Sequence, residues 1–243
     1  MLDDLPPITE IQRTVLLSPG EAKLYDSVRE AAIAKLGAAA SGSAQARVQI
    51  FAELTRLRRL CCHPQLVAPA ANLTSAKLES FLELVRELVA GRHRVLVFSQ
   101  FTDVLALVKP LLDASDITYQ YLDGATSMKQ RTAAVDAFQG GDDDVFLISL
   151  KAGGFGLNLT SADYVIHLDP WWNPAVESQA TDRAHRIGQT RPVTVYRLVT
   201  AGTIEARIVE LHREKRDLAD ALLEDTDRAA KLTERELRSL LEA

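Results

Sequence analysis

Five short apolar segments that alternate with helical patterns constrain the fold of this chain more than any other feature. The segments are 94–99, 117–122, 145–150, 164–168 and 193–199. Apolar runs of this length suit the strands of a parallel sheet that is buried on both faces, and the intervening patterns suit crossover helices. The sequence therefore predicts an α/β fold whose ligands meet the loops at the carboxyl ends of the strands.

Helical patterns precede, interrupt and follow this region. Ser18-Pro19-Gly20-Glu21 is a capping box with proline at the first helical position, which predicts a helix from Pro19 to about Leu36. The other expected helices cover 44–60, 75–90, 101–112, the residues after Ser127, the residues after Asn173-Pro174, 203–223 and the residues after Thr233. The segment 37–43, rich in alanine, glycine and serine, is expected to form a mobile loop.

Composition and charge exclude several classes of protein. Hydrophobic residues make up 47% of the 243 residues and charged residues 25%, which is typical of a globular protein with a sizeable core. No apolar run reaches the roughly 18 residues of a membrane span, and no signal-peptide pattern opens the chain. The net charge of −5 does not favour DNA binding, although non-specific DNA affinity depends on local clusters of lysine and arginine.

Cys61, Cys62 and His63 are consecutive, and they raise the question of a metal site. Zinc ligands are usually two to four residues apart and need a second pair, which this chain lacks. Adjacent cysteines rarely form a disulfide, because disulfide geometry is specific. We therefore expect reduced thiols at a packed helix end, and no metal.

The phosphate-binding half of an ATP site is missing from the sequence. A P-loop has the form GxxxxGK[ST], and no Gly-Lys pair occurs anywhere in the chain. The strand that leads to Asp169 resembles a Walker B strand, but Pro170 and Trp171 follow in place of a second carboxylate. Asp169 is therefore interpreted as a side chain that orders a loop, with a magnesium ligand as the alternative.

Two arginines carry the chemistry that is present. Gln179, Arg183 and Arg186 stand at positions i, i+4 and i+7, so they are expected on one face of the helix after Pro174. Arginine stays charged, and its fork matches phosphate oxygens. An arginine placed beside a γ-phosphate is worth roughly 10³ to 10⁵ in rate. Spacing alone leaves a solvated face equally open, with Asp182 pairing Arg186.

Three further features admit both a structural and a nucleic-acid-binding interpretation. The glycines at 153, 154 and 156 follow an apolar strand, and they would let backbone N–H groups approach a phosphate or simply form a tight turn. Trp171 and Trp172 occupy a loop bounded by prolines. Arg56, Arg58 and Arg59 form either a solvated helix face or a nucleic-acid or interlobe contact.

Six segments, in order, resemble the motifs of the Swi/Snf-type DNA-dependent ATPases of helicase superfamily two. They are 57–64 (LRRLCCHP), 95–102 (VLVFSQFT), 122–126 (LDGAT), 149–159 (SLKAGGFGLNL), 169–174 (DPWWNP) and 182–189 (DRAHRIGQ). The resemblance covers nearly all of the chain. It implies the second RecA-like lobe of a motor, with a family-specific helical subdomain (18–70), an α/β core (75–200) and a C-terminal helical brace (203–243).

The resemblance also implies roles for particular residues. Arg183 and Arg186 would be arginine fingers, and Gln179 and Gly156 would contact ATP, which the first RecA-like lobe of the same protein would hold together with Mg²⁺. The residues implied to contact double-stranded DNA are Gly124, Thr126, Lys151, Gly153, Gly154 and Trp172. Contacts of this type position a duplex and do not read its sequence.

The same resemblance sets expectations for the whole protein. The chain would be a segment of a longer polypeptide, would not hydrolyse ATP alone, and would act as a monomer. We expect it in the cytoplasm, associated with the nucleoid if the source is prokaryotic.

Two other functions stay open. The second lobe of a DEAD-box RNA helicase would carry an arginine where this chain has Gln189, and it would lack the segment 171–174. A non-catalytic nucleic-acid-binding or assembly module would have no need of both arginines. A P-loop and an Asp-Glu box earlier in the longer protein would favour the motor lobe over the non-catalytic module.

Overall fold

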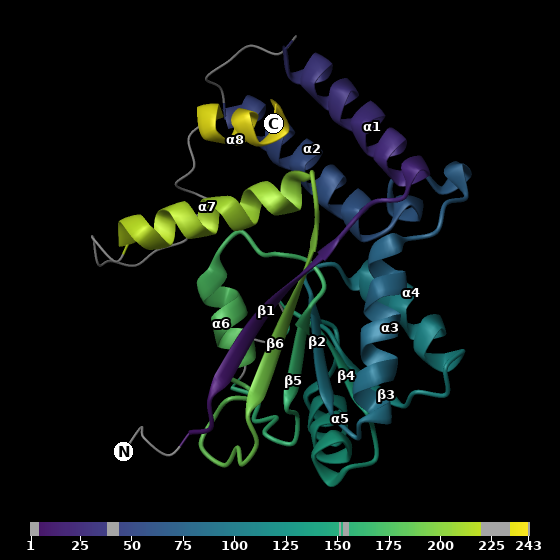
Figure 1. The fold of residues 1–243 in the computed structure, drawn as a ribbon, viewed down its shortest axis with the longest axis vertical. Coiled ribbons are helices and arrows are strands. Elements are labelled where there is room, and N and C mark those ends of the chain that lie inside the picture. Colours follow the sequence, from purple (N-terminus) through teal and green to yellow (C-terminus); the bar gives the residue numbers. More distant parts are fainter. Residues whose placement is uncertain (1–4, 38–43, 151, 153–155, 220–233, 243) are drawn as a thin grey trace. The chain divides into compact units, whose positions relative to one another are not determined.

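The computed structural model describes residues 5–37, 44–150, 152, 156–219 and 234–242 (Figure 1). Residues 38–43 of the predicted loop lie outside this part. The chain divides into two compact units, which we describe separately. The first comprises Met1–Arg13, Leu78–Asp169 and Ala175–Val199, and the second comprises Thr14–Lys77, Pro170–Pro174 and Thr200–Ala243.

Within the described residues, six strands form one parallel sheet in the order β1-β6-β5-β2-β4-β3. The strands are β1 (Ile8–Val15), β2 (Val95–Ser99), β3 (Tyr119–Leu122), β4 (Val145–Ser149), β5 (Tyr164–His167) and β6 (Val193–Thr200). Every residue of β2 and β4 is buried, as expected for central strands covered on both faces. The predicted α/β fold and the five predicted strands are confirmed.

The edge strand β1 was not predicted from the sequence. Most of its residues are exposed, so it lacks the continuous apolar run that marks the central strands. Its β-branched residues, Ile8, Thr9, Ile11, Thr14 and Val15, are the signal that favours a strand. An N–H···O bond of 3.1 Å from Val193 to Pro7 begins its pairing with β6.

The helices that accompany the sheet are α3 (Ala76–Ala90), α4 (Thr102–Asp113), α5 (Met128–Gly140) and α6 (Pro174–Thr181). Helix α5 begins with the predicted capping box, in which Ser127 and Gln130 satisfy each other's backbone N–H groups. The first three helices agree with the predicted ranges. Helix α6 is much shorter than predicted, with consequences for the arginines described below.

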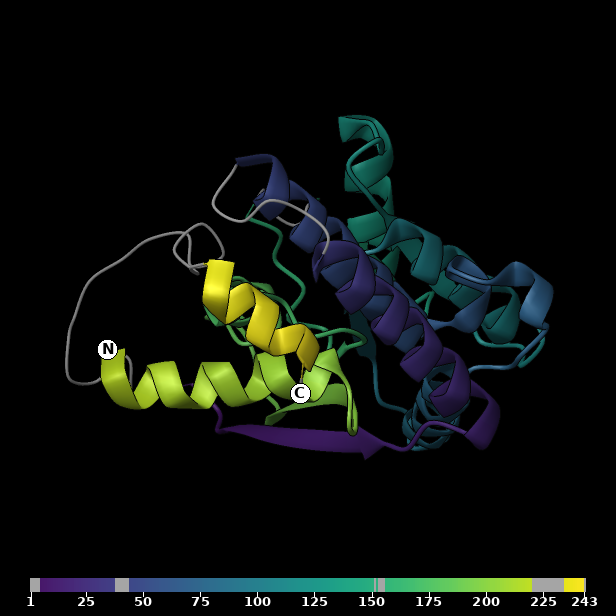
Figure 2. The ribbon, with the colours of Figure 1, turned by 90° about the horizontal axis from the view of Figure 1, so that it is seen from above.

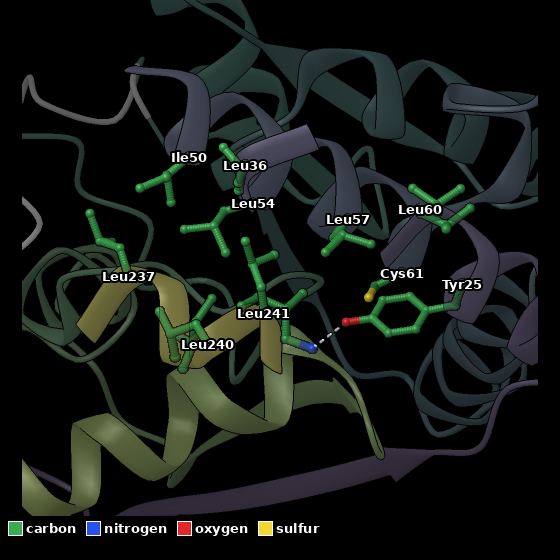
Figure 3. Packing of buried hydrophobic residues seen from close by; sticks show 13 residues of the cluster. Tyr25, Leu36, Ile50, Leu54, Leu57, Leu60, Cys61, Leu237, Leu240 and Leu241 are labelled. Carbon is green, nitrogen blue, oxygen red and sulfur yellow. Dashed lines mark hydrogen bonds between the residues drawn. The ribbon is translucent and has the colours of Figure 1, made fainter. Parts of the chain in front are cut away.

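Helices from both ends of the sequence build the second unit. They are α1 (Pro19–Gly37), α2 (Ala44–Cys62), α7 (Ile204–Ala219) and α8 (Glu234–Glu242), with short 3-10 helices η1 (Pro64–Leu66) and η2 (Pro69–Ala71). Helix α8 packs against α1, α2 and α7 (Figure 2). Leucines of α2 and α8 share one buried cluster with Tyr25 and Cys61 (Figure 3). A single hydrophobic core therefore joins segments far apart in the chain.

A buried ion pair fixes the start of α7 in this unit. Lys77 and Glu205 are 1% and 0% exposed, and the Lys77 Nζ lies 2.6 Å from the Glu205 Oε1. Glu205 also accepts a hydrogen bond from the N–H of Thr200, at 2.9 Å. The Tyr25 hydroxyl accepts from the N–H of Ile204 at 2.7 Å (Figure 3), and burial raises the pKa of Tyr25 well above its usual value.

We expect Lys77→Met to lower the free energy of unfolding by about 3–5 kcal/mol, because it leaves the Glu205 carboxylate buried without its cation. Urea unfolding followed by circular dichroism measures the effect. Arg207→Met is the matched control, since Arg207 pairs with Glu210 on the exposed surface of the same helix, and its loss changes stability by less than about 1 kcal/mol. Equal effects of the two substitutions would contradict the assignment.

Candidate nucleotide and DNA sites

Helix α6 ends at Thr181, so the prediction that Arg183 and Arg186 lie on its face is wrong. Both arginines belong to the turns that follow. The helix stops because its next carbonyl groups are taken by other partners. The Arg183 carbonyl accepts from the N–H of Leu159 at 2.9 Å, and the Ala184 carbonyl accepts from the side chain of Gln189 at 3.0 Å.

The turns nevertheless bring together all four residues that the sequence analysis assigned to nucleotide. A cleft of about 360 Å³ in the first unit is lined by Gln179, Arg183, Arg186 and Gly156. The remaining lining residues are Leu5, Leu157, Asp182, His185 and Ile187. The cleft is therefore formed by the loop after α6, the loop after β4 and the residues before β1.

Arg183 is the most unusual side chain of this cleft. It is only 6% exposed, and its Nε and Nη1 atoms have no hydrogen-bond partner within the described residues. Its guanidinium carbon lies 6.0 Å from the centre of the Phe98 ring. Burial, and then the positive charges of Arg131 and Arg186, lower the pKa of Arg183 to about 10. Since the pKa of arginine is lowered, the folded chain disfavours the positive charge that Arg183 carries at neutral pH.

Arg186 is exposed beside it, and so is Asp182. Among the described residues no ion pair joins Asp182 to Arg186, so the solvated-face interpretation lacks its expected contact. Two guanidinium groups, one of them buried and without an ion pair among the described residues, make this cleft suitable for a phosphate-sized anion.

The loop after β4 contributes Gly156 to the cleft. Gly156 has φ of +48°, a left-handed conformation that disfavours other residues, and it is exposed. Just before it, the carbonyl of buried Ala152 accepts a 2.7 Å hydrogen bond from Arg131. The predicted DNA contacts Lys151, Gly153 and Gly154 lie outside the described residues.

Asp169 behaves as a loop-ordering residue. It is fully buried, its Oδ1 accepts from the Ser99 hydroxyl, and its Oδ2 accepts from the N–H of Gln100 at 3.4 Å. It thereby connects the carboxyl ends of β2 and β5. Within the described part of the chain, no group of three or more His, Cys, Asp or Glu side chains is placed to hold a metal ion.

Gln189 is a structural residue, which the sequence analysis did not foresee. Its side-chain amide donates to the carbonyls of Thr160, Ala162 and Ala184, and its oxygen accepts from two backbone N–H groups that follow it. A buried amide that satisfies five partners fixes the turn that carries Arg186. Gln189 therefore holds the loop and does not line the cleft.

Gly124 and Thr126 form a turn organised by Asp123. The Asp123 Oδ1 accepts from the N–H groups of Ala125 and Thr126 and from the Thr126 hydroxyl, at 2.9–3.1 Å. The Tyr121 hydroxyl donates to the other oxygen of Asp123, at 2.8 Å. These hydrogen bonds lower the pKa of Asp123 despite its partial burial. Gly124 is exposed at the tip of this turn.

In the second unit, Arg58 fits neither earlier interpretation of the arginine cluster at the end of α2. Arg58 is 1% exposed, so it is neither a solvated residue nor an accessible contact for nucleic acid. Arg56 is exposed, and its Nη1 lies 3.7 Å from a carboxylate oxygen of Glu53. Trp171 and Trp172 are half-buried beside Arg58.

Cys61 and Cys62 are buried thiols at the end of α2, as predicted for a packed helix end. Burial raises the pKa of the Cys61 thiol, which keeps it protonated. The Nδ1 atom of His63 accepts from the N–H of Gln65 at 3.0 Å and caps η1. Among the described helices, none combines the length and the apolar character needed to cross a lipid bilayer.

Comparison with known proteins identifies the class of this fold and site. Residues 76–188 match the helicase conserved C-terminal domain, so the chain contains a RecA-like helicase lobe. The Sulfolobus solfataricus SWI2/SNF2 ATPase C-terminal domain is similar over 97% of this chain and 98% of its own, with a TM-score of 0.77 and 28% identity. Residues 76–188 thus form a helicase C-terminal domain, and the chain is similar over nearly its whole length to the C-terminal domain of a Swi2/Snf2 ATPase, in agreement with the resemblance found in the sequence.

Two further similarities extend this comparison. The Sulfolobus solfataricus SWI2/SNF2 ATPase core in complex with dsDNA has a TM-score of 0.80 and 29% identity, covering all of this chain and 52% of that one. The putative ATP-dependent helicase/translocase YwqA of Bacillus subtilis is 36% identical over 98% of this chain and 26% of its own length. The chain spans about a quarter of the length of the curated relatives it matches first.

We expect Arg183→Met to raise the free energy of unfolding of this chain by about 1 kcal/mol, because it removes a buried charge that makes no ion pair among the described residues. Thermal and urea unfolding measure the change. Arg131→Met is the contrasting variant, since it loses the bond to the Ala152 carbonyl and costs about 1–3 kcal/mol. If both variants were destabilised alike, Arg183 would be an ordinary structural residue.

Proposed function

We propose that this chain is the second motor lobe of an ATP-dependent double-stranded DNA translocase. The observation that carries the proposal is Arg183, a buried cation with unpartnered nitrogen atoms that lines a cleft together with Arg186. A charge held in this way is stabilised when an anion enters the cleft. The γ-phosphate of ATP, bound by a P-loop elsewhere, has the charge and oxygen geometry that two arginines recognise.

The role proposed for the two arginines follows from the negative charge that develops in the transition state of phosphoryl transfer. Negative charge spreads over the equatorial oxygens of the γ-phosphoryl group as it leaves, and preorganised cations lower the energy of that state. Arg186 is exposed and can reach outward, whereas Arg183 is held by packing. Gln179 and Gly156 would complete the polar wall of the cleft, and Mg²⁺ would be held mainly by the first lobe.

The descriptions of two similar proteins support this proposal. One is described as a helicase/translocase and another as an ATPase core in complex with double-stranded DNA. A lobe without a P-loop supplies only half of an ATP site. We therefore propose that the first lobe of the same protein is its partner, and that the complete motor acts as a monomer.

The proposed DNA contacts are Gly124, Thr126, Trp172 and, outside the described residues, Lys151, Gly153 and Gly154. Asp123 already binds the N–H and the hydroxyl of Thr126, so its carboxylate fixes the shape of the turn before DNA arrives. Trp172 is half-buried, so part of this residue is open to contact from outside the lobe. These contacts would hold the backbone without reading sequence.

In the complete motor, meaning this chain joined to a first lobe that carries a P-loop, we expect Arg183→Ala or Arg186→Ala to lower DNA-stimulated kcat roughly 10³-fold or more. A coupled ATPase assay measures it. Arg191→Ala is the matched control, because Arg191 lies in the same segment but pairs with Asp163 at 3.0 Å and does not line the cleft.

Equal stimulated rates for wild type and Arg186→Ala would remove the finger assignment. This chain alone should show no ATP turnover, because it has no P-loop. If the isolated chain hydrolysed ATP at a rate unaffected by Arg186→Ala, the proposed function as a second motor lobe would be refuted.

We expect Trp172→Ala to weaken binding of the complete motor to a DNA duplex about tenfold, as for an aromatic residue near the centre of an interface. Fluorescence anisotropy of a labelled duplex at fixed salt measures the affinity. Trp171→Phe serves as the control from the neighbouring position. Unchanged affinity of the Trp172→Ala variant would show that this ring does not face DNA.

A further inference from the structure

The buried guanidinium of Arg58 joins helix α2 to the tryptophan loop, defined here as residues 170–172. Its carbon atom lies 5.1 Å from the centre of the Trp172 ring and 6.0 Å from that of Trp171. Its Nη2 atom donates a 2.5 Å hydrogen bond to the Pro170 carbonyl. One side chain of α2 therefore contacts all three residues of the loop.

Two other side chains of the second unit hold the same loop. Phe51 stands seven residues before Arg58 on α2, hence on the same helical face, and its ring meets Trp172 edge-on at 6.4 Å and 90°. His212 on α7 contacts the Trp172 carbonyl through its Nε2 at 3.1 Å. The Trp172 ring and its backbone are thus restrained separately, by α2 and by α7.

The chemistry of Arg58 suits this task better than that of any other residue. A planar guanidinium can lie against an aromatic ring and donate hydrogen bonds in its own plane at the same time, whereas a lysine ammonium is a compact point charge without a planar face. Arg58 is 1% exposed, so its position is set by packing and it contacts no solvent-borne ligand. A side chain held in this way determines the orientation of the ring that it touches.

We propose that Arg58 is a positioning residue that orients Trp172 for its contact with DNA. Arg58 itself touches no DNA. Its contacts make the position of the tryptophan loop depend on the position of α2. A shift of the helices in the second unit would therefore change the affinity of the lobe for the duplex. The DNA consequence rests on the function proposed above, whereas the restraint of Trp172 does not.

The restraint is tested first on this chain alone. Trp171 and Trp172 are its two tryptophans, so Trp171→Phe leaves Trp172 as the single emitter. In that background we expect Arg58→Lys and Arg58→Met to raise the acrylamide quenching constant of Trp172 about twofold, since both remove the planar guanidinium that packs against the ring. Arg56→Lys is the matched control, because Arg56 is exposed on the same helix two residues earlier.

Circular dichroism must show native helix content in each variant, and Arg58→Lys keeps the test valid if Arg58→Met fails to fold. Unchanged quenching in a folded Arg58→Lys variant would overturn the proposal. The second test measures duplex affinity in the complete motor. Arg58→Lys should weaken it about tenfold and Arg56→Lys should not.

The two tests separate the inference from the function on which it rests. Increased quenching together with an affinity loss in both Arg58→Lys and Trp172→Ala supports the proposal. A different outcome overturns the positioning role: Arg58→Lys increases quenching but keeps wild-type affinity for the duplex, whereas Trp172→Ala loses affinity. Wild-type affinity in Trp172→Ala refutes the proposed DNA contact of this ring, and with it the DNA consequence of Arg58, while the restraint stands on the quenching result.

Discussion

Burial of the parallel sheet on both faces is the constraint on which the rest of this lobe depends. Strands such as β2 and β4 have no exposed residue, so polar chemistry is confined to the loops that follow them. Gly124 follows β3, Ala152 and Gly156 follow β4, and Asp169 follows β5. Asp169 and Ser99 bind each other across two of these strand ends. Gly124, Ala152, Gly156 and Asp169 therefore lie in segments that follow strand ends, whereas Arg183 and Arg186 lie between α6 and β6.

The two buried cations Lys77 and Arg183 differ in whether a carboxylate forms an ion pair with them. Lys77 is paired with Glu205, and the pair ties the start of α7 to Lys77 in the first turn of α3. Arg183 makes no ion pair among the described residues, and burial, followed by repulsion from Arg131 and Arg186, lowers its pKa despite the nearby carboxylate of Asp182. The first arrangement stabilises the fold. The second stores unfavourable energy at the cleft, which an incoming phosphate would release, and perturbed groups of this kind are characteristic of functional sites.

The helical unit adds a mechanical link to this chemistry. Its core is built from α1, α2, α7 and α8, so residues near both ends of the sequence restrain each other (Figure 3). The tryptophan loop belongs to the same unit, where Arg58, Phe51 and His212 hold it. Trp172 thus depends on contacts from helices that contribute nothing to the nucleotide cleft.

The sequence by itself determined the parts that follow from local periodicity and local hydrogen bonding. The central strands, the capping boxes at Ser18 and Ser127 and most helix ranges were predictable, because apolar spacing and a cap three residues from its partner are local signals. The identity of the cleft residues was predictable too, since the motif places Gln179, Arg183 and Arg186 close together in the chain.

Only the tertiary structure decided where α6 ends, how Arg58 is used and that β1 exists. Leu159 and Gln189 capture the carbonyls that would have continued α6, and the edge strand forms because β6 offers it a partner. Arg58 is buried because two tryptophan rings and a carbonyl from a distant loop surround it. Each of these outcomes depends on a partner remote in sequence, and periodicity carries no information about such partners.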